Sequence, residues 1–168
     1  MVSVRPAVLS DIPQMQAIEI DAGELFREIG LARVADDPPP EAAVLAAHIA
    51  DGSAWVAELD GVVEGYAVAS VVDGEGHLDQ VSVRRAAGGQ GLGRALIEQV
   101  CGWAVDQGRD AVTLTTYVDV PWNAPLYKRT GFVAVTDGEC GPGLAAIREA
   151  ERAAGLDVLS RTAMRRRL

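Results

Sequence analysis

Four glycines fall within six positions, from Gly88 to Gly93, between a β-branched run and an apolar helical pattern. The run from His77 to Val83 predicts a strand, and the residues from Leu92 onward predict a helix. The first N–H groups of a helix bind anions, because they have no partner within the helix and lie at the positive end of its dipole. Glycine lets phosphate oxygens approach those groups without a Cβ in the way. The spacing therefore predicts a site for a phosphate-bearing ligand.

The loop lacks residues that two common nucleotide sites require. No Lys-Ser or Lys-Thr follows Gly93, so the P-loop motif GxxxxGK[ST] is not matched. Gly89, Gly91 and Gly93 give GxGxG instead of the GxGxxG of dinucleotide sites, and the loop lies in the middle of the chain. A nucleotide-binding α/β protein is one alternative, and a glycine-rich turn without a ligand is another.

With its flanking residues, the loop resembles motif A of the GNAT family of N-acetyltransferases. In that family the loop after the fourth strand, commonly Arg/Gln-x-x-Gly-x-Gly/Ala, binds the pyrophosphate of acetyl-CoA. Gly88 stands where Arg or Gln is common, so Arg84, Arg85 or Arg94 would have to supply the missing contact, or CoA binds more weakly. The resemblance implies acetyl-CoA as the co-substrate, bound by Val81, Val83, Gly88, Gly89, Gln90, Gly91, Leu92, Gly93 and Arg94.

A second stretch resembles motif B of the same family, in which an Asn and a Tyr precede a Gly-Phe pair. Tyr127, Gly131 and Phe132 occupy the corresponding places. Asn123 lies four residues before Tyr127, whereas the common Asn lies seven before it, where Val120 stands here. The resemblance implies that Asn123 contacts CoA and that Tyr127 donates a hydrogen bond to the departing thiolate, whose thiol has an ordinary pKa of about 8.5. A Tyr packed between helix and sheet is the alternative.

Acetylation of an amine also requires a proton acceptor, because an alkylammonium with a pKa of about 10.4 has no lone pair for attack. In the GNAT family a carboxylate or His on the fourth strand often takes this proton, sometimes through water. His77 and Asp79 share a strand face with Val81 and Val83, since side chains alternate along a strand. We expect Asp79 first and His77 second in this role, and a plain surface position is the alternative for each. By resemblance, the backbone N–H near Val83 faces the thioester oxygen, where negative charge develops.

The acceptor site is expected between Glu19 and Asp37, where Gly23 and Gly30 interrupt the apolar pattern and predict an irregular segment. Irregular segments near a binding site often determine specificity. Candidates for binding the amine are Glu19, Asp21, Glu24 and Phe26, with Glu19 and Phe26 as the selected pair. A solvated acidic face is the alternative reading of the carboxylates.

Composition limits the partners. A chain of 168 residues with 49% hydrophobic residues can form one compact domain, so we expect a single domain over residues 1–168. The net charge of -9 disfavours nucleic acid and is compatible with a cationic acceptor, a small amine or a peptide. Cys101 and Cys140 are too few for a disulfide framework, and no signal peptide or membrane-spanning run is visible. We therefore expect a cytoplasmic protein with no membrane partner and no metal.

Strands and helices are expected over most of the chain. The Asp60-Gly61 pair predicts a hairpin. The predicted strands are 2–5, 53–59, 62–72, 77–83, 111–117, 132–135 and 158–168. The first predicted helix begins near Asp11. Four further helices are predicted at 41–50, 91–107, 122–130 and 144–154. The fold class is α/β with α+β character. The resemblance implies a mixed, largely antiparallel sheet of six to seven strands flanked by helices, with strands four and five splayed into a cleft.

These observations predict an acetyl-CoA-dependent N-acetyltransferase, an acyltransferase in which a primary amine attacks directly in a ternary complex. A covalent acyl-enzyme is not expected, since neither cysteine falls beside a plausible base in the sequence. The alternative is a CoA-binding sensor or partner-binding module that has the fold without the chemistry. Members of the resembling family are often dimers, so a homodimer is also expected.

Overall fold

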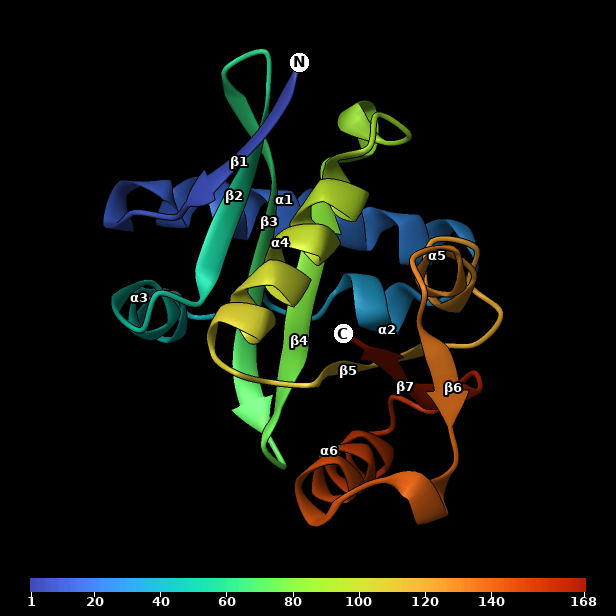
Figure 1. Cartoon of the computed structure of the whole chain (residues 1–168). Helices are drawn as coiled ribbons and strands as arrows, with labels where there is room; N and C mark the ends of the chain where they lie inside the picture. The colour runs from blue at the N-terminus through green and yellow to red at the C-terminus, as the bar shows by residue number, and fades with distance from the viewer. The chain divides into compact units, whose positions relative to one another are not determined.

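The computed structural model describes every residue from Met1 to Leu168. Seven strands form a mostly antiparallel sheet in the order β1-β2-β3-β4-β5-β7-β6, flanked by helices as the sequence predicted (Figure 1). The strands are β1 (Val2–Pro6), β2 (Ala54–Leu59), β3 (Val62–Val72), β4 (Glu75–Val83), β5 (Ala111–Tyr117), β6 (Val133–Val135) and β7 (Arg161–Arg167). The helices are α1 (Ile12–Glu28), α2 (Ala32–Ala35), α3 (Ala42–Ala50), α4 (Leu92–Asp106), α5 (Ala124–Arg129) and α6 (Pro142–Ala153). Short 3₁₀ turns are η1 (Leu9–Asp11), η2 (Arg85–Ala87) and η3 (Asp137–Glu139). A membrane-spanning helix is not among these elements, because none is both long and apolar enough.

The chain divides into two compact units. The first comprises Met1–Ser70 and Asp79–Val100, and the second comprises Val71–Leu78 and Cys101–Leu168. The glycine loop and the segment expected to bind the acceptor both belong to the first unit.

In the first unit β1, β2 and β3 are antiparallel neighbours. The turn between β2 and β3 has left-handed backbone at Asp60 (φ 52°) and Gly61 (φ 83°), which confirms the predicted hairpin. Asp73 (φ 54°) and Gly74 (φ 77°) repeat this geometry between β3 and β4. Both turns use a short acidic residue followed by glycine, the pair that tolerates positive φ best.

Helices cover both faces of the first unit's strands, with α1 behind them and α4 in front in the view of Figure 1. Tyr66 of β3 belongs to a buried cluster with Met15 and Ile18 of α1. Its neighbour Gly65 faces the other way, where an added Cβ would lie 3.2 Å from Leu96 Cδ1 of α4. The alternation along β3 therefore assigns one face to α1 and the other to α4.

Helix α1 corrects the expectation of an irregular segment after Glu19. The helix continues through Gly23 to Glu28, and a second short helix, α2, follows. A helical glycine costs only about 1 kcal/mol relative to alanine, and the buried Met15 and Ile18 anchor the helix. Burial of the apolar face of α1 thus outweighed the low helix propensity of Gly23. The irregular parts are the residues around Gly30, which has positive φ (82°), and those that follow α2 from Asp36 onward.

In the second unit β5 pairs with β7 along its whole length, and β6 pairs with the other edge of β7. The start of β4 pairs in parallel with β5 at Gly76↔Val112 and His77↔Thr113. Strand β7 begins at Arg161, three residues later than the pattern predicted. Three of its arginines, Arg165, Arg166 and Arg167, contact Glu75 or the Thr130 carbonyl oxygen.

Helix α6 begins at Pro142, two residues before the predicted start, because a distant carboxylate caps it. Asp73 accepts hydrogen bonds from the N–H groups of Gly143 (2.7 Å) and Leu144 (2.9 Å). A Cβ at Gly141 or Gly143 would lie 2.6 and 2.8 Å from the Asp73 carboxylate, so both positions require glycine. A carboxylate at a helix N-terminus satisfies otherwise unpaired N–H groups and favours the start of the helix.

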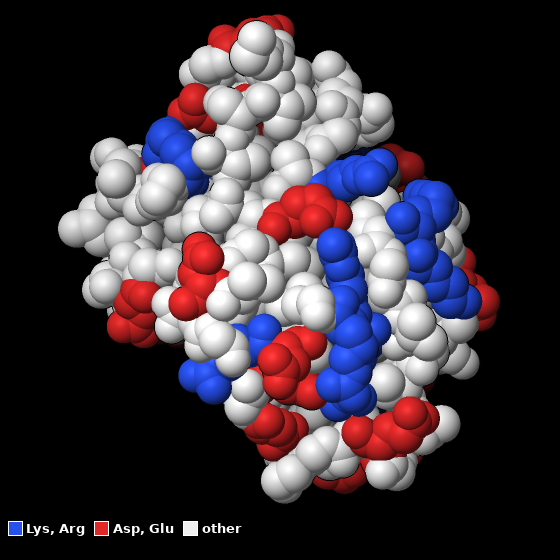
Figure 2. All heavy atoms as spheres, in the orientation of Figure 1, with Lys and Arg blue, Asp and Glu red and all other residues white.

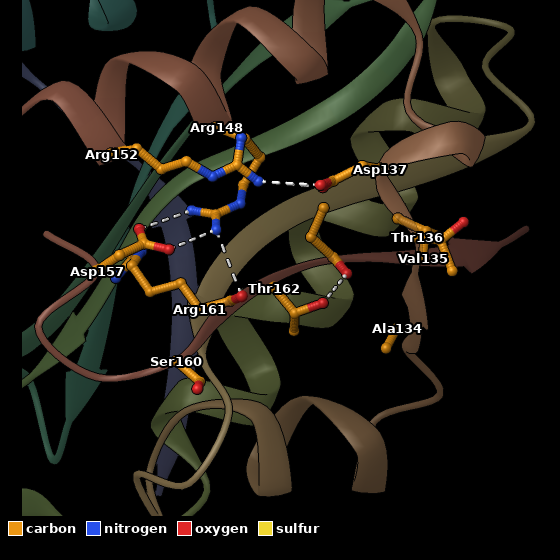
Figure 3. A pocket seen from close by; sticks show the side chains of 11 residues that line it. Ala134, Val135, Thr136, Asp137, Arg148, Arg152, Asp157, Ser160, Arg161 and Thr162 are labelled. Carbon is orange, nitrogen blue, oxygen red and sulfur yellow. Dashed lines mark hydrogen bonds and ion pairs between the residues drawn. The ribbon is translucent and has the colours of Figure 1, made fainter.

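A shallow hollow of about 470 Å³, here called the arginine hollow, lies among β6, β7, η3 and α6 (Figure 3). Its charged lining consists of Asp137, Arg148, Arg152, Asp157 and Arg161. On the face drawn in Figure 2, basic and acidic side chains are interspersed, in keeping with the many arginine–carboxylate pairs of the chain.

Candidate functional site

The glycine loop leads from β4 through η2 into α4, as the sequence predicted. Gly89 (φ 75°) and Gly91 (φ 90°) have left-handed backbone, which side chains other than glycine adopt only with strain. An added Cβ at either residue would meet nothing within 4 Å, so the loop is open on its outer side. The first helical hydrogen bond runs from Ala95 N–H to the Gly91 carbonyl oxygen at 3.0 Å. The N–H groups of Leu92 to Arg94 precede that bond and can receive an anion.

Gly88 differs from its neighbours in the loop. Its φ of -61° is open to any residue, and an added Cβ would lie 3.2 Å from the Arg85 carbonyl oxygen. The backbone conformation therefore does not explain a glycine at this position. A side chain would fit after a shift of a few tenths of an ångström.

Two of the three arginines near the loop are already paired. Arg84 Nε lies 3.0 Å from Glu64 Oε2, and Arg84 Nη2 donates to Gln14 Oε1. Arg85 donates to Asp21 from its backbone N–H (2.8 Å) and from its guanidinium. Burial opposes ionisation of Asp21, yet these hydrogen bonds from Arg85 outweigh it and lower the pKa of the Asp21 carboxyl. Arg94 is exposed and has no carboxylate partner, so it is the arginine left for a phosphate group.

The first unit also contains a hydrogen-bonded group, here called the Glu19 cluster, made of Glu19, Tyr66, Gln80 and Ser82. Glu19 Oε2 accepts from Tyr66 Oη (2.7 Å) and Ser82 Oγ (2.6 Å). Gln80 Nε2 donates to Glu19 Oε1 at 2.9 Å and to Ser82 Oγ at 3.0 Å. The cluster thus joins α1 to β3 and β4 around one half-buried carboxylate.

Burial keeps the phenol of this cluster protonated. The Tyr66 side chain is fully buried, and burial followed by the nearby Glu19 carboxylate raises the pKa of the phenol. Tyr66 therefore acts as a hydrogen-bond donor to Glu19 across the physiological range.

The structure separates Asp79, which the sequence proposed as the proton acceptor, from Glu19, which it proposed to bind the amine. Glu19 lies on the α1 side of β4 with Gln80 and Ser82, whereas Asp79 projects from the alternate face. Asp79 is exposed and accepts a hydrogen bond from Ser70 Oγ at 3.1 Å. Val81 and Val83 share its face, and Val83 Cγ2 lies 3.8 Å from the position of an added Cβ at Gly93. Asp79, Val81 and Val83 therefore line the side of the glycine loop and α4.

His77, Asn123 and Tyr127 belong to the second unit. His77 is buried, and its Nδ1 lies 2.9 Å from Thr113 Oγ1. Asn123 precedes α5, and its Oδ1 accepts from Thr116 Oγ1 at 3.0 Å. The half-buried ring of Tyr127 meets Phe132 edge to face, with ring centroids 5.9 Å apart. Phe26, the remaining candidate, is half-buried on α1, seven residues beyond Glu19 and on the same side of the helix.

Sequence reasoning missed three members of the Glu19 cluster: Tyr66, Gln80 and Ser82. The signal was present, since Gln80 and Ser82 alternate in phase on a strand face that an apolar helix had to cover. Polar residues on such a face require partners. What the sequence did not show was that α1 covers this face and delivers Glu19 to it.

Structures of known proteins have the same fold. N-acetylglutamate synthase from Neisseria gonorrhoeae, complexed with coenzyme A and N-acetyl-glutamate, gives a TM-score of 0.72 at 22% identity over 100% of this chain and 35% of that chain. A Mycobacterium tuberculosis protein in complex with CoA gives 0.75 at 21% identity over 99% of both chains. A ribosomal-protein alanine N-acetyltransferase from Escherichia coli gives 0.68 at 19% identity over 99% of this chain and 94% of that chain.

The family follows from the sequence match. The profile of the acetyltransferase (GNAT) family matches residues 19–132, a span that includes Glu19, β4, the glycine loop and α5. CoA appears in the descriptions of several of the similar structures. The chain belongs to the acetyltransferase (GNAT) family.

Proposed function

We propose that this protein is an acetyl-CoA-dependent N-acetyltransferase that acetylates a primary amine by direct attack in a ternary complex. The observation that carries the proposal is the open glycine loop at the N-terminus of α4, in a chain of the acetyltransferase family. The backbone N–H groups of the loop and the free guanidinium of Arg94 bind the phosphate groups of the cofactor. Val81 and Val83 extend along the strand beside the loop, where strand N–H and C=O groups can bind the arm of CoA.

Acetyl-CoA supplies the acetyl group as a thioester, so transfer forms an N–C bond, breaks a C–S bond and leaves a thiolate. Tyr127 donates a proton or a hydrogen bond to that thiolate, and Asn123 contacts CoA, as the resemblance implies. Asp79 accepts the proton that the ammonium must lose. Its exposure supports it over His77, whose buried imidazole contacts Thr113. Glu19 and Phe26 bind the acceptor.

Calorimetry on the purified protein tests whether it binds acetyl-CoA. We expect binding heat with acetyl-CoA but none with ATP or NAD. A panel of primary amines is then screened for release of free CoA. The proposal would be overturned if acetyl-CoA gave no binding heat. It would also be overturned if every amine of the panel left CoA release at the rate of acetyl-CoA hydrolysis.

Substitution of Tyr127 by Phe distinguishes the enzyme from a CoA-binding sensor with the same fold. We expect kcat to fall about 100-fold, because a positioned acid contributes that much, while the Kd for acetyl-CoA stays the same. Tyr117→Phe is the matched control, because it also removes a phenol hydroxyl, one that donates to the Leu156 carbonyl oxygen at 2.8 Å. A sensor would bind acetyl-CoA without turnover and would respond to neither change.

A further inference from the structure

The glycine loop is attached to helix α1 through the first backbone group of η2. Asp21 of α1 accepts a hydrogen bond from the Arg85 N–H at 2.8 Å. Among the backbone groups of residues 85–91, this N–H is the one that bonds to a side chain of another element. Asp21 therefore holds the loop at the point where the chain leaves β4.

The residue that Asp21 holds also makes the next hydrogen bond of the loop. The Arg85 carbonyl oxygen accepts from the Gly88 N–H at 3.1 Å, which closes the turn of η2. Gly89 and Gly91, with their positive φ, follow directly and lead into α4. The direction in which the open N–H groups point thus depends on the position of η2, and η2 is held by Asp21.

The guanidinium of Arg85 makes a second contact with the same carboxylate. Its Nε and Nη2 lie 3.3 and 3.2 Å from Asp21 Oδ1, while the backbone N–H bonds to Oδ2. Its Nη1 also lies 3.6 Å from Glu28 Oε1, seven residues further along α1. Both oxygens of Asp21 are therefore occupied by Arg85, which leaves Asp21 poorly suited to bind an amine. An arginine held by two carboxylates is in turn a poor ligand for a phosphate group.

We propose that Asp21 is a positioning residue of the cofactor site, which holds the Arg85 N–H and thereby aims the N–H groups of the glycine loop at the diphosphate of acetyl-CoA. This inference rests on the proposed binding of acetyl-CoA. It assigns Asp21, an amine candidate in the sequence, to the cofactor instead. Helix α1 then serves both substrates, because Glu19 and Phe26 of the same helix are proposed to bind the acceptor.

Three variants separate the backbone contact from the contact between side chains. Asp21→Ala removes both contacts. Asp21→Asn keeps an oxygen for the Arg85 N–H without the charge, and Arg85→Ala keeps the backbone bond without the guanidinium. We expect the Kd for acetyl-CoA, measured by calorimetry, to rise about tenfold in Asp21→Ala and about two- to threefold in the other two, because binding must then order a loop that is held less firmly.

Asp11→Ala is the matched control. Asp11 makes the same two kinds of contact, with the Val8 N–H at 2.8 Å and with the Arg5 guanidinium at 2.8 and 3.0 Å. It lies ten residues before Asp21, which is about 15 Å along a helix. We expect Asp11→Ala to lower the urea midpoint and to leave the Kd for acetyl-CoA unchanged.

Steady-state kinetics add a readout that a general loss of stability does not move. Asp21→Ala should raise the KM for acetyl-CoA while kcat and the KM for the amine stay constant, because the contact affects cofactor binding and not the transfer step. If Asp21→Ala does not fold, Asp21→Asn and Arg85→Ala carry the same test, since each keeps one of the two contacts.

The opposite sign is expected if Arg85 is itself a phosphate ligand. Asp21→Ala and Asp21→Asn would then free its guanidinium and lower the Kd for acetyl-CoA, and Arg85→Ala would have the largest effect of the three. Either result overturns the inference, as does an unchanged Kd in the Asp21 variants or an equal rise in Asp11→Ala. All of these leave the enzyme proposal intact. Absence of binding heat in the unmodified protein instead overturns the proposed function, and this inference with it.

Discussion

The Glu19 cluster of the first unit and the arginine hollow of the second both gather charged and hydrogen-bonding side chains around strands, yet they use them differently. In the arginine hollow, charges of opposite sign satisfy one another. Arg148 Nη2 lies 2.9 Å from Asp157, and Arg152 Nη2 lies 3.2 Å from Asp137 (Figure 3). Arg148 Nη1 also lies 2.8 Å from Glu151. In the Glu19 cluster a single charge is held by neutral donors and has no counter-ion.

The difference shows why charge and concavity alone do not identify a binding site. The hollow has about 470 Å³ of open space and three arginines in its lining. Its guanidinium groups are nevertheless committed to carboxylates, and Arg161 also lies over the Tyr117 ring at 4.4 Å. The Arg161 Nε atom is the exception, since it is buried without a hydrogen-bond partner. We interpret the hollow as an ion-pair network that fixes α6 to β7, and the Glu19 cluster as a single carboxylate held by neutral donors.

The largest effect should follow from breaking the arginine network at its buried member. The Arg148 side chain is only 4% exposed, and Arg148→Met would leave Glu151 and Asp157 without their shared cation. We expect a loss of about 2 kcal/mol in the free energy of unfolding, measured by urea denaturation, because Asp157 and Glu151 lose their hydrogen bonds from a buried guanidinium, although Glu151 keeps Arg161 at 3.0 Å. Arg152→Met is the control, since its side chain is 38% exposed and exposed pairs contribute less than about 1 kcal/mol. Equal stability of the two variants would contradict the structural role given to the hollow.

The second effect concerns the N–H donors of the glycine loop in the first unit. Gly91→Ala places a Cβ on backbone with φ 90°, which strains the loop and tilts the N–H groups at the start of α4. We expect the Kd for acetyl-CoA to rise about tenfold, measured by calorimetry, which corresponds to about 1.4 kcal/mol. Gly88→Ala is the matched change in the same loop: its φ of -61° suits alanine, and its Cβ requires only a small shift from the Arg85 carbonyl oxygen, 3.2 Å away. If both substitutions weakened binding equally, loop conformation would not be the cause.

A third effect is the acid sensitivity of the arginine hollow. Hydrogen bonds from Arg148 lower the pKa of Asp157 below its ordinary value of 3.8. A lowered pKa in the folded state means that the stabilisation is fully present above that ordinary value and is lost as the pH falls through the folded-state pKa. The urea midpoint should therefore drop between pH 5 and pH 2 less steeply in Asp157→Asn than in the unmodified protein. Asp106→Asn, which removes an exposed carboxylate without an arginine partner, should leave the slope unchanged.

Much of the fold could be predicted from local patterns because its turns have strong chemical signals. The Asp60-Gly61 hairpin and the strand from Ala111 to Tyr117 are confirmed, and α4 begins directly after Gly91. Each depends on residues that are adjacent in the chain. The predictions that were wrong concern helix bounds that depend on residues distant in the chain. Helix α1 passes through Gly23 because its apolar face is buried, and α6 starts early because Asp73 caps it from another loop.

The site shows the same division. The glycine loop could be predicted, because its left-handed glycines and the start of the following helix depend on a few adjacent residues. The partners of Glu19 were not, because the sequence gives the alternation of β4 but not the helix that each face meets. Asp79 was selected as the proton acceptor and Glu19 as a residue that binds the amine, and only the structure shows that they lie on opposite faces of β4. The roles assigned to Tyr127, Asn123, His77 and Phe26 stay predictions.

The smallest predicted effect is a gain, and it calibrates the loop comparison. Gly102 lies within α4, is exposed, and an added Cβ there would meet nothing within 4 Å. Gly102→Ala should therefore stabilise the protein by about 0.5–1 kcal/mol, because alanine restricts the unfolded chain and favours the helix. Urea denaturation measures the gain, and acetyl-CoA affinity should not change. A destabilised Gly102→Ala would contradict the predicted gain. If Gly102→Ala instead weakened acetyl-CoA binding, the weaker binding of Gly91→Ala could no longer be assigned to the positive φ of Gly91.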